Sequence, residues 1–280
     1  MDLMIPTDFD YFRPDDLQEA EAIYQELNDQ KRNPVFYSGG SEIISMSRVG
    51  SIAPGVVIDL KAIPECNQVY FEGNELVIGA CVTLSKIVEE KTFPLLATTV
   101  GRIADHTNQC RITLGGNVCG TIIYRESVLP LLLTECNVCI YGLEGERCVH
   151  INEVFDRRIK LSPGEFITRF KIGSEYLTDR YVHVKKTRGE KIDYPLLTVA
   201  AIDHEGDIRA AFSGICSFPF RSSLIEETLN DHKMSLQQMA DKIAFELPDV
   251  VINDVIASAD YKLFVLKNTI VDMMNAFGGM

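Results

Sequence analysis

The chain has 280 residues, of which 46% are hydrophobic and 24% are charged, so it is long enough to bury one large core or two ordinary ones. Its formal net charge of −13 repels a nucleic-acid backbone, and no basic patch offsets that charge. No apolar run approaches the roughly 20 residues that cross a bilayer, and the N-terminal residues lack the segments of a secretory signal, so we expect a cytoplasmic protein that binds neither membrane nor nucleic acid.

Up to about residue 172, apolar periodicity and chain breakers predict short strands and helices in alternation. Two aspartates suit the first turn of the first helix, Thr83 is suited to cap another, and Pro94 to begin a third. Residues 72–74 form a hairpin turn between two alternating apolar runs. The predicted elements are a helix over 15–30, strands over 35–37 and 56–60, a hairpin over 69–82, helices over 84–90 and 94–107, a strand-like piece over 110–114, a buried helix over 128–135, and strands over 137–142, 146–150 and 166–172.

The pattern changes near residue 175. Three strands are predicted over 181–187, 196–203 and 208–215, and helices then occupy most of 222–277, the longest over 251–277. Strands followed by helices are typical of an α+β domain with an antiparallel sheet backed by helices. The sequence therefore predicts two domains, 1–175 and a smaller one over 176–280.

Eight cysteines without an export signal indicate reduced thiols rather than a disulfide framework. Cys136 and Cys139 form a lone C-x-x-C, whereas zinc or an iron–sulfur cluster needs about four ligands. We expect both to be small core residues and the chain to bind no metal.

Familiar catalytic signatures are missing from the sequence. It contains no G-x-S-x-G, H-E-x-x-H, phosphate-binding P-loop or Rossmann fingerprint. Its five histidines stand without ligand spacing, so each is expected to be structural or exposed. No catalytic residue is predicted.

Two glycine pairs remain as candidates for ligand binding. The first glycine turn is Ser38-Gly39-Gly40-Ser41, and the second glycine turn spans residues 113–117, Thr-Leu-Gly-Gly-Asn. A diphosphate needs converging backbone N–H donors, which glycine exposes because no Cβ blocks the approach. Paired glycines also simply make turns, and the residues alone leave both explanations open.

An ordered series of motifs resembles the flavin subunit of the molybdenum hydroxylases, the family of xanthine dehydrogenase and carbon monoxide dehydrogenase. Residues 37–43, YSGGSEI, are similar to the family's A-G-G-[ST]-[DE]-[LI]. Residues 111–117, RITLGGN, are similar to R-N-x-[GA]-[ST]-[IVL]-G-G-N. Further similar segments, in chain order across nearly the whole sequence, are IDL at 58–60, IGA at 78–80, VTL at 82–84, FPLL at 93–96, SPGE at 162–165, Lys185 with Arg188 and Asp193, GDIR at 206–209, and Asp254, Ala257, Ser258, Tyr261 and Lys262.

The resemblance implies a PCMH or vanillyl-alcohol-oxidase-type FAD-binding domain over 1–175, followed over 176–280 by a C-terminal α+β domain of the CO dehydrogenase flavoprotein type. Molybdopterin is expected on a large partner subunit and two 2Fe–2S clusters on a small one, as a dimer of heterotrimers. Electrons would pass from the clusters through FAD to NAD or another acceptor. FAD is expected to be non-covalent, because the first glycine turn contains no histidine or cysteine.

Carried over position by position, the resemblance implies a set of cofactor-binding residues. The two glycine turns would wrap the diphosphate, two isoleucines would contact the cofactor, a lysine would lie beside the flavin, and a glutamate, where the family usually has aspartate, would bind ribityl or ribose hydroxyls. The set is Tyr37, Ser38, Gly39, Gly40, Ser41, Glu42, Ile103, Thr113, Gly115, Gly116, Asn117, Glu126, Ile167 and Lys185.

The chain departs from the family pattern after the second glycine turn. Bulky Ile123, Tyr124 and Arg125 replace the small residues and proline that are usual there, which bears on access to the flavin. Two other functions therefore remain as alternatives: a stand-alone PCMH-type flavoprotein oxidoreductase, and a non-catalytic nucleotide-binding or assembly protein.

Overall fold

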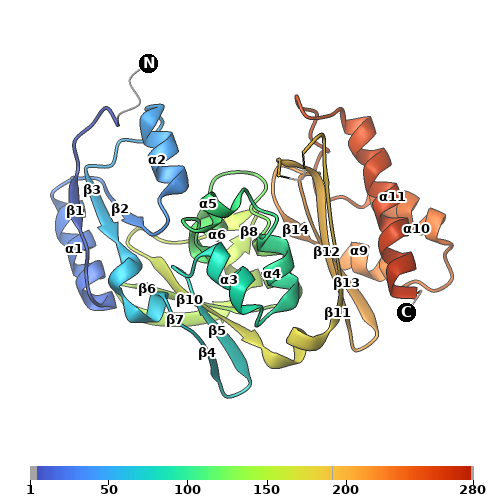
Figure 1. The fold of residues 1–280 in the computed structure, drawn as a ribbon, viewed down its shortest axis with the longest axis horizontal. Helices are drawn as coiled ribbons and strands as arrows, with labels where there is room; N and C mark the ends of the chain where they lie inside the picture. The colour runs from blue at the N-terminus through green and yellow to red at the C-terminus, as the bar shows by residue number, and fades with distance from the viewer. Residues whose placement is uncertain (1–4, 191, 279–280) are drawn as a thin grey trace. The chain divides into compact units, whose positions relative to one another are not determined.

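The computed structural model describes residues 5–190 and 192–278 (Figure 1). By Cα proximity they form two compact units that are interleaved in sequence. Unit 1 contains the residues up to Lys86 together with 106–120 and 137–172, and unit 2 contains 87–105, 121–136 and the residues from Gly173 onward. Two segments before residue 175, namely 87–105 and 121–136, cluster with the C-terminal residues. The units are therefore not the same division as the predicted domain boundary at residue 175, which stays a prediction.

In unit 1, a three-stranded sheet has its strands in the order β1 (Asp10–Phe12), β3 (Val56–Asp59), β2 (Pro34–Tyr37), with both outer strands parallel to β3. Helix α1 (Leu17–Asp29) contributes Leu17, Ala20 and Leu27 to the same core cluster as the buried residues of β3. Asp16 caps α1 by accepting the N–H of Glu19. The predicted helix over 15–30 and strands over 35–37 and 56–60 are confirmed.

A five-stranded sheet completes the framework of unit 1. Its order is β4 (Val69–Glu72), β5 (Glu75–Gly79), β10 (Phe166–Gly173), β6 (Asn137–Gly142), β7 (Gly145–His150). Both predicted hairpins and the predicted strand over 166–172 are confirmed. The smaller elements of unit 1 are η1 (Leu60–Ala62), η2 (Pro64–Cys66), α2 (Ser41–Arg48), α5 (His106–Gln109), α6 (Leu114–Cys119), α8 (Ile151–Val154), β8 (Phe155–Asp156) and β9 (Arg158–Ile159), while α3 (Leu84–Glu90) crosses from unit 1 into unit 2.

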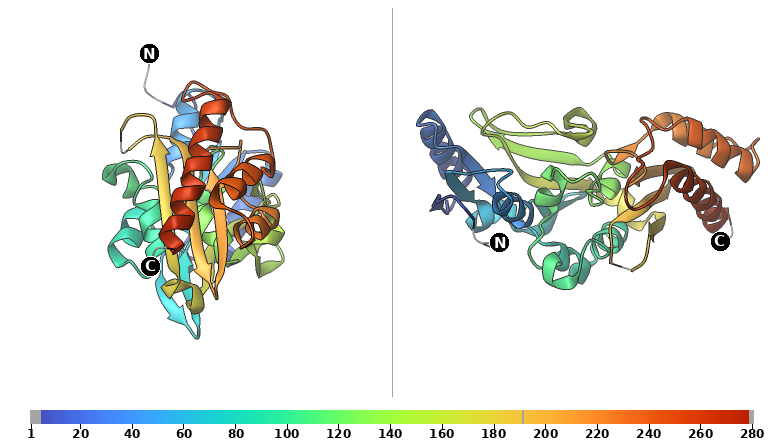
Figure 2. Two further views of the ribbon diagram at one scale, coloured as in Figure 1. Left: turned by 90° about the vertical axis from the view of Figure 1, so that its right-hand side faces the viewer. Right: turned by 90° about the horizontal axis from the view of Figure 1, so that it is seen from above.

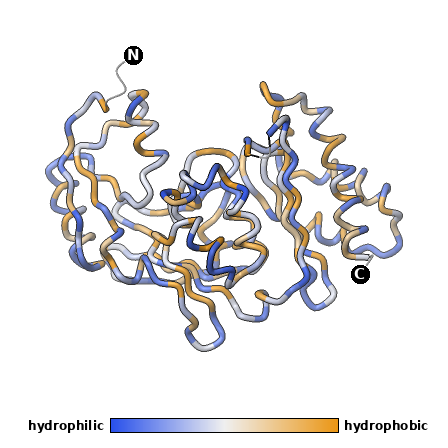
Figure 3. Tube along the Cα trace, viewed as in Figure 1, coloured by the Kyte–Doolittle hydropathy of each residue, from blue (hydrophilic) through white to orange (hydrophobic). Residues whose placement is uncertain are grey.

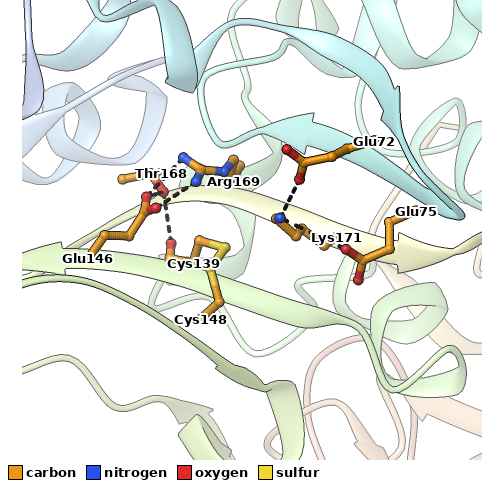
Figure 4. Close-up of a disulfide and its surroundings, with 8 residues drawn as sticks. All are labelled: Glu72, Glu75, Cys139, Glu146, Cys148, Thr168, Arg169 and Lys171. Atoms are coloured by element: carbon orange, nitrogen blue, oxygen red, sulfur yellow. Dashed lines mark hydrogen bonds and ion pairs between the residues drawn. A yellow bond between two sulfur atoms is a disulfide. The ribbon is translucent and has the colours of Figure 1, made fainter.

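The expectation that all cysteines are reduced is wrong for one pair. Cys139 of β6 and Cys148 of β7 form a disulfide (Figure 4). The two residues are directly paired in the antiparallel ladder, with their Cα atoms 4.0 Å apart, so the hairpin register brings the sulfurs together. Among the described residues, the other six cysteines form no disulfide, and Cys136 is buried as predicted.

Two further local predictions need correction. The helix predicted over 94–107 ends early: α4 covers Pro94–Val100 with Gly101 as its C-cap, and Ala104 has a positive φ that interrupts helical geometry. The strand-like piece over 110–114 is not a strand. Residues 110–112 lie in a turn and loop, Thr113 forms an isolated bridge with Thr83, and α6 begins at Leu114, because the Thr113 hydroxyl accepts the N–H of Gly116 and caps the helix.

In unit 2, an antiparallel sheet has the order β11 (Arg180–Thr187), β12 (Pro195–His204), β13 (Asp207–Ser213), β14 (Phe220–Arg221). The predicted α+β architecture of the C-terminal part is thereby confirmed. The helices of unit 2 are α4, α7 (Val128–Leu133), η3 (Ser174–Thr178), α9 (Ser223–Leu229), α10 (Leu236–Phe245) and α11 (Ala259–Gly278).

Both faces of strand β12 are covered, so its first eight residues are all buried. Side chains alternate across a strand. On one face, Leu197, Val199 and Ala201 pack in a core with helices α9, α10 and α11, which cover that side of the sheet (Figures 2 and 3). Thr198 faces the other way and hydrogen-bonds Glu126, shortly before α7.

The last helix is shorter than predicted: α11 begins at Ala259 rather than at 251. The Asp254 carboxylate accepts hydrogen bonds from the backbone N–H groups of Ile256 and Ala257 and forms an ion pair with Lys262. These contacts hold the residues before α11 in a turn. Within the described ranges, no helix combines the length and apolarity that a bilayer-crossing segment needs.

Candidate functional site

The first glycine turn connects β2 to α2. Gly40 adopts φ 69°, the left-handed region that disfavours a side chain, and precedes Ser41, the first residue of α2. The ring of Tyr37 folds over this glycine, so that a Cβ added to Gly40 would lie 2.2 Å from the ring. Burial is the main cause that raises the pKa of Tyr37, with the Asp59 carboxylate adding to it.

The second glycine turn is held by two backbone hydrogen bonds. The N–H of Leu114 donates to the carbonyl oxygen of Val82 at 2.9 Å, and the N–H of Gly115 donates to that of Ala80 at 2.8 Å. A Cβ on Gly115 would lie 2.7 Å from the Cβ of Ala80, so only glycine permits this approach. The turn is therefore packed directly on the residues that follow β5.

The two glycine turns meet in space, although 75 residues separate the side chains that join them. The hydroxyls of Ser38 and Thr113 share a hydrogen bond of 2.8 Å. A Cβ on Gly39 would lie 2.0 Å from the carbonyl oxygen of Arg111, and one on Gly116 would lie 3.3 Å from Ser38 Oγ. The proximity required for one shared diphosphate is thus present in unit 1.

Ile167 lies on β10, one residue before Thr168, which connects this strand to the second glycine turn. It is buried and pairs with Ile140 of β6. The next residue, Thr168, accepts the N–H of Ala80 at 2.8 Å, and the carbonyl oxygen of Ala80 accepts from Gly115. A continuous hydrogen-bonded path therefore connects this strand to the turn.

Three other candidate residues lie in unit 2, where Lys185 and Glu126 form a buried ion pair. Lys185 Nζ donates to Glu126 Oε2 at 2.9 Å and to the carbonyl oxygen of Arg102 at 2.8 Å, while Thr198 donates to Glu126 Oε1 at 2.6 Å. Their side chains are only 2% and 4% exposed. Burial raises the pKa of Glu126, and the Lys185 ammonium opposes that rise. Ile103 was predicted to lie within a helix. It is instead half-buried in a turn that follows α4.

Sequence reasoning missed the histidine beside this ion pair. His183 lies two residues before Lys185 on β11 and hence on the same face of the strand. Neither ring nitrogen has a hydrogen-bond partner among the residues that the structure describes, and burial, with the nearby Arg102 and Lys185 cations, lowers the pKa of His183 to about 4. The sequence did contain a signal for this: residues 181–185, YVHVK, read as a strand, and in a strand His183 and Lys185 point to the same face.

The segment that departs from the family pattern is packed into unit 2. Arg125 is 2% exposed, and Tyr124 stacks on Tyr194 with ring centroids 4.8 Å apart. Ser213 donates its hydroxyl to the carbonyl oxygen of Tyr124. Arg125 therefore lies in the interior of the unit, whereas Ile123 and Tyr124 are only half-buried. No group of three or more His, Cys, Asp or Glu in the described ranges is arranged to hold a metal ion.

Comparison with known proteins identifies the family. Residues 7–174 match the model of the FAD binding domain in molybdopterin dehydrogenase. The chain is 28% identical over 239 residues to the caffeine dehydrogenase subunit beta of Pseudomonas sp. (strain CBB1), covering 81% of this chain and 79% of that protein. It is also 28% identical over 261 residues to the glyceraldehyde dehydrogenase medium chain of Sulfolobus acidocaldarius, covering 87% and 90%.

Solved structures share the fold at lower identity. A chain of carbon monoxide dehydrogenase from Hydrogenophaga pseudoflava superposes with a TM-score of 0.86 at 23% identity, covering 98% of both chains. A chain of quinoline 2-oxidoreductase from Pseudomonas putida superposes with a TM-score of 0.84 at 20% identity, covering 97% of this chain and 96% of that one. Since the family model spans more than half of the sequence, the chain belongs to the FAD-binding family of the molybdopterin dehydrogenases and is a flavin subunit of an oxidoreductase.

Proposed function

We propose that this chain binds FAD non-covalently and passes electrons from 2Fe–2S clusters on a small partner subunit to NAD⁺ or another acceptor. The electrons originate at molybdopterin on a large partner subunit, in a dimer of heterotrimers. Relatives are a subunit of caffeine dehydrogenase and a medium chain of glyceraldehyde dehydrogenase. On this proposal, the organic substrate binds to the large partner.

The observation that carries the proposal is the junction of the two glycine turns in unit 1. Within the described part of the chain, the backbone N–H groups of Gly39, Gly40 and Ser41 have no acceptor. A Cβ on Gly116 would lie 2.7 Å from Thr113 Oγ1 and 3.3 Å from Ser38 Oγ, so glycine allows both hydroxyls to lie beside the second turn. Unpaired N–H donors and hydroxyls, gathered where no Cβ intrudes, suit a diphosphate. The residues present therefore fit FAD.

Bound FAD supplies one-electron exchange with an iron–sulfur cluster and hydride exchange with nicotinamide. For this chain, we assign residues 37–42 and 113–117 to binding and orienting the diphosphate, and Ile103 and Ile167 to apolar contact with the cofactor. Glu126 and Lys185 are assigned to the ribityl or ribose hydroxyls and to the flavin ring. Because the two already form an ion pair, they meet the cofactor as a preassembled pair with fixed side chains.

The test begins with the purified chain and continues with its complex. The chain should acquire a flavin absorption spectrum when FAD is added, and should release the FAD intact when denatured. Co-purification from the native source should recover a large and a small subunit. In that complex, anaerobically reduced flavin should be reoxidised by NAD⁺ or by a ferredoxin, whichever is the acceptor.

Two results would contradict the proposal. A chain that stays colourless with FAD would refute cofactor binding. A lone chain that turns over a small substrate with its bound flavin would favour the stand-alone oxidoreductase instead.

A further inference from the structure

A lysine outside both glycine turns contacts the first glycine turn. Lys61 lies in η1, immediately after β3, the central strand of the three-stranded sheet. Its Nζ donates to the carbonyl oxygen of Ser38 at 2.9 Å. The same ammonium lies 4.4 Å from the centre of the Tyr37 ring, which covers Gly40. Lys61 thus contacts the residues on the strand side of the glycine pair.

The bond to Ser38 determines which way the next N–H points. The Ser38 carbonyl and the Gly39 N–H belong to one planar trans peptide, in which the two groups point in opposite directions. Holding the oxygen toward Lys61 therefore aims the Gly39 N–H away from Lys61. Glycine tolerates many backbone conformations, so without this bond the peptide is free to rotate and to present its carbonyl oxygen to the ligand.

Asp59 fixes the position of the lysine. Both of its carboxylate oxygens accept from Lys61 Nζ, at 2.8 and 2.7 Å, and Oδ1 also accepts the Lys61 backbone N–H. The Asp59 side chain is 4% exposed and receives a third donor, the Tyr11 hydroxyl. That hydrogen bond is the main cause that raises the pKa of Tyr11 to about 12. Strand β3 thereby anchors the ammonium and offsets its charge.

We propose that Lys61 is a positioning residue for the diphosphate, acting through the Ser38–Gly39 peptide with Asp59 as its anchor. The inference rests on the proposed binding of FAD. Its chemical signature is a shared loss: FAD and ADP, which have the adenosine diphosphate part in common, should depend on Lys61 by the same factor. A purely structural role would instead lower the stability of the ligand-free chain and weaken no ligand selectively.

The experiment compares Lys61→Met with the wild-type chain, using FAD and ADP as probes. We expect about tenfold weaker binding of both, corresponding to one lost hydrogen bond to an oriented peptide. In ³¹P spectra, the diphosphate resonances of bound FAD should shift. Lys61→Arg keeps a cationic donor and should recover most of the affinity. The matched control, Lys171→Met, removes another lysine of unit 1 that pairs with a carboxylate, and should bind both ligands like the wild type.

Asp59→Asn gives a second route if Lys61→Met does not fold. It leaves the lysine in place without its charged anchor and should weaken FAD and ADP by equal factors. Wild-type affinity for both ligands in either variant would overturn the inference, as would a loss for FAD that ADP does not share. Those results leave FAD binding itself intact. A wild-type chain that binds neither FAD nor ADP would instead refute the proposed function, and this inference with it.

Discussion

Replacing Gly39 with alanine tests whether the contact between the two glycine turns creates the diphosphate site. The added Cβ would lie 2.0 Å from the carbonyl oxygen of Arg111 and 3.0 Å from its carbonyl carbon. Both are backbone atoms, so no side chain can rotate out of the way. Gly39 does not have a positive φ, so alanine adds this clash without conformational strain of its own.

The size of the effect follows from the overlap. To reach the 3.0 Å that marks the closest approach of real Cβ atoms, the two backbones must separate by about 1 Å. A hydrogen bond of about 2.9 Å to a ligand held by both turns would then exceed its useful range. Losing two bonds to an anion, each contributing about 1.5 kcal/mol, costs about 3 kcal/mol, or roughly a hundredfold in Kd.

The assay is titration of the ligand-free chain with FAD, followed by the change in flavin fluorescence. Gly189→Ala is the control, because a Cβ at Gly189 meets nothing within 4 Å. Thermal unfolding of both ligand-free variants shows whether each is folded. A folded Gly39→Ala chain whose Kd lies within about threefold of the wild type would refute the assignment of the site to the junction of the turns.

Three further predictions concern stability. Lys185→Met leaves a buried carboxylate without its cation and should cost about 3 to 5 kcal/mol at neutral pH. Since burial already raises the folded-state pKa of Glu126 above the unfolded value of 4.5, this loss should grow as the pH rises above 4.5 and shrink as the pH falls toward it, as urea unfolding at several pH values will show. The folded-state pKa of His183 is lowered instead, from 6.5 to about 4, so its contribution is complete above pH 6.5 and is lost as the pH falls. Between pH 7 and pH 5, the free energy of unfolding should therefore fall by about 2 kcal/mol less in His183→Leu than in the wild type. An equal fall in the two proteins would contradict this cause. The disulfide, with a sequence separation of 9, should contribute about 2 to 3 kcal/mol. Dithiothreitol should thus lower the urea midpoint of the wild type but not that of Cys148→Ser, and equal sensitivity of the two proteins would exclude the bond.

Much of the fold was predictable because the signals are local. Helix α1 follows from one apolar face and the cap at Asp16, and β12 and β13 follow from two largely apolar runs separated by a turn at Glu205-Gly206. Two errors occurred where a nearby polar group competes with the periodic pattern. Thr113 caps α6 at the end of a segment predicted to be strand-like, and Asp254 holds a turn that delays the start of α11.

Local sequence patterns were sufficient to predict most of the helices and strands, the two glycine pairs, and the motif order that points to a flavin subunit. Which of these residues come into contact could be seen only once the chain was folded. The hydroxyls of Ser38 and Thr113, the carboxylate of Glu126 and the ammonium of Lys185, and the sulfurs of Cys139 and Cys148 are joined by sheet register and packing. Periodicity and capping act over a few residues of chain, whereas such contacts depend on how whole sheets and helices pack, and no local pattern records that.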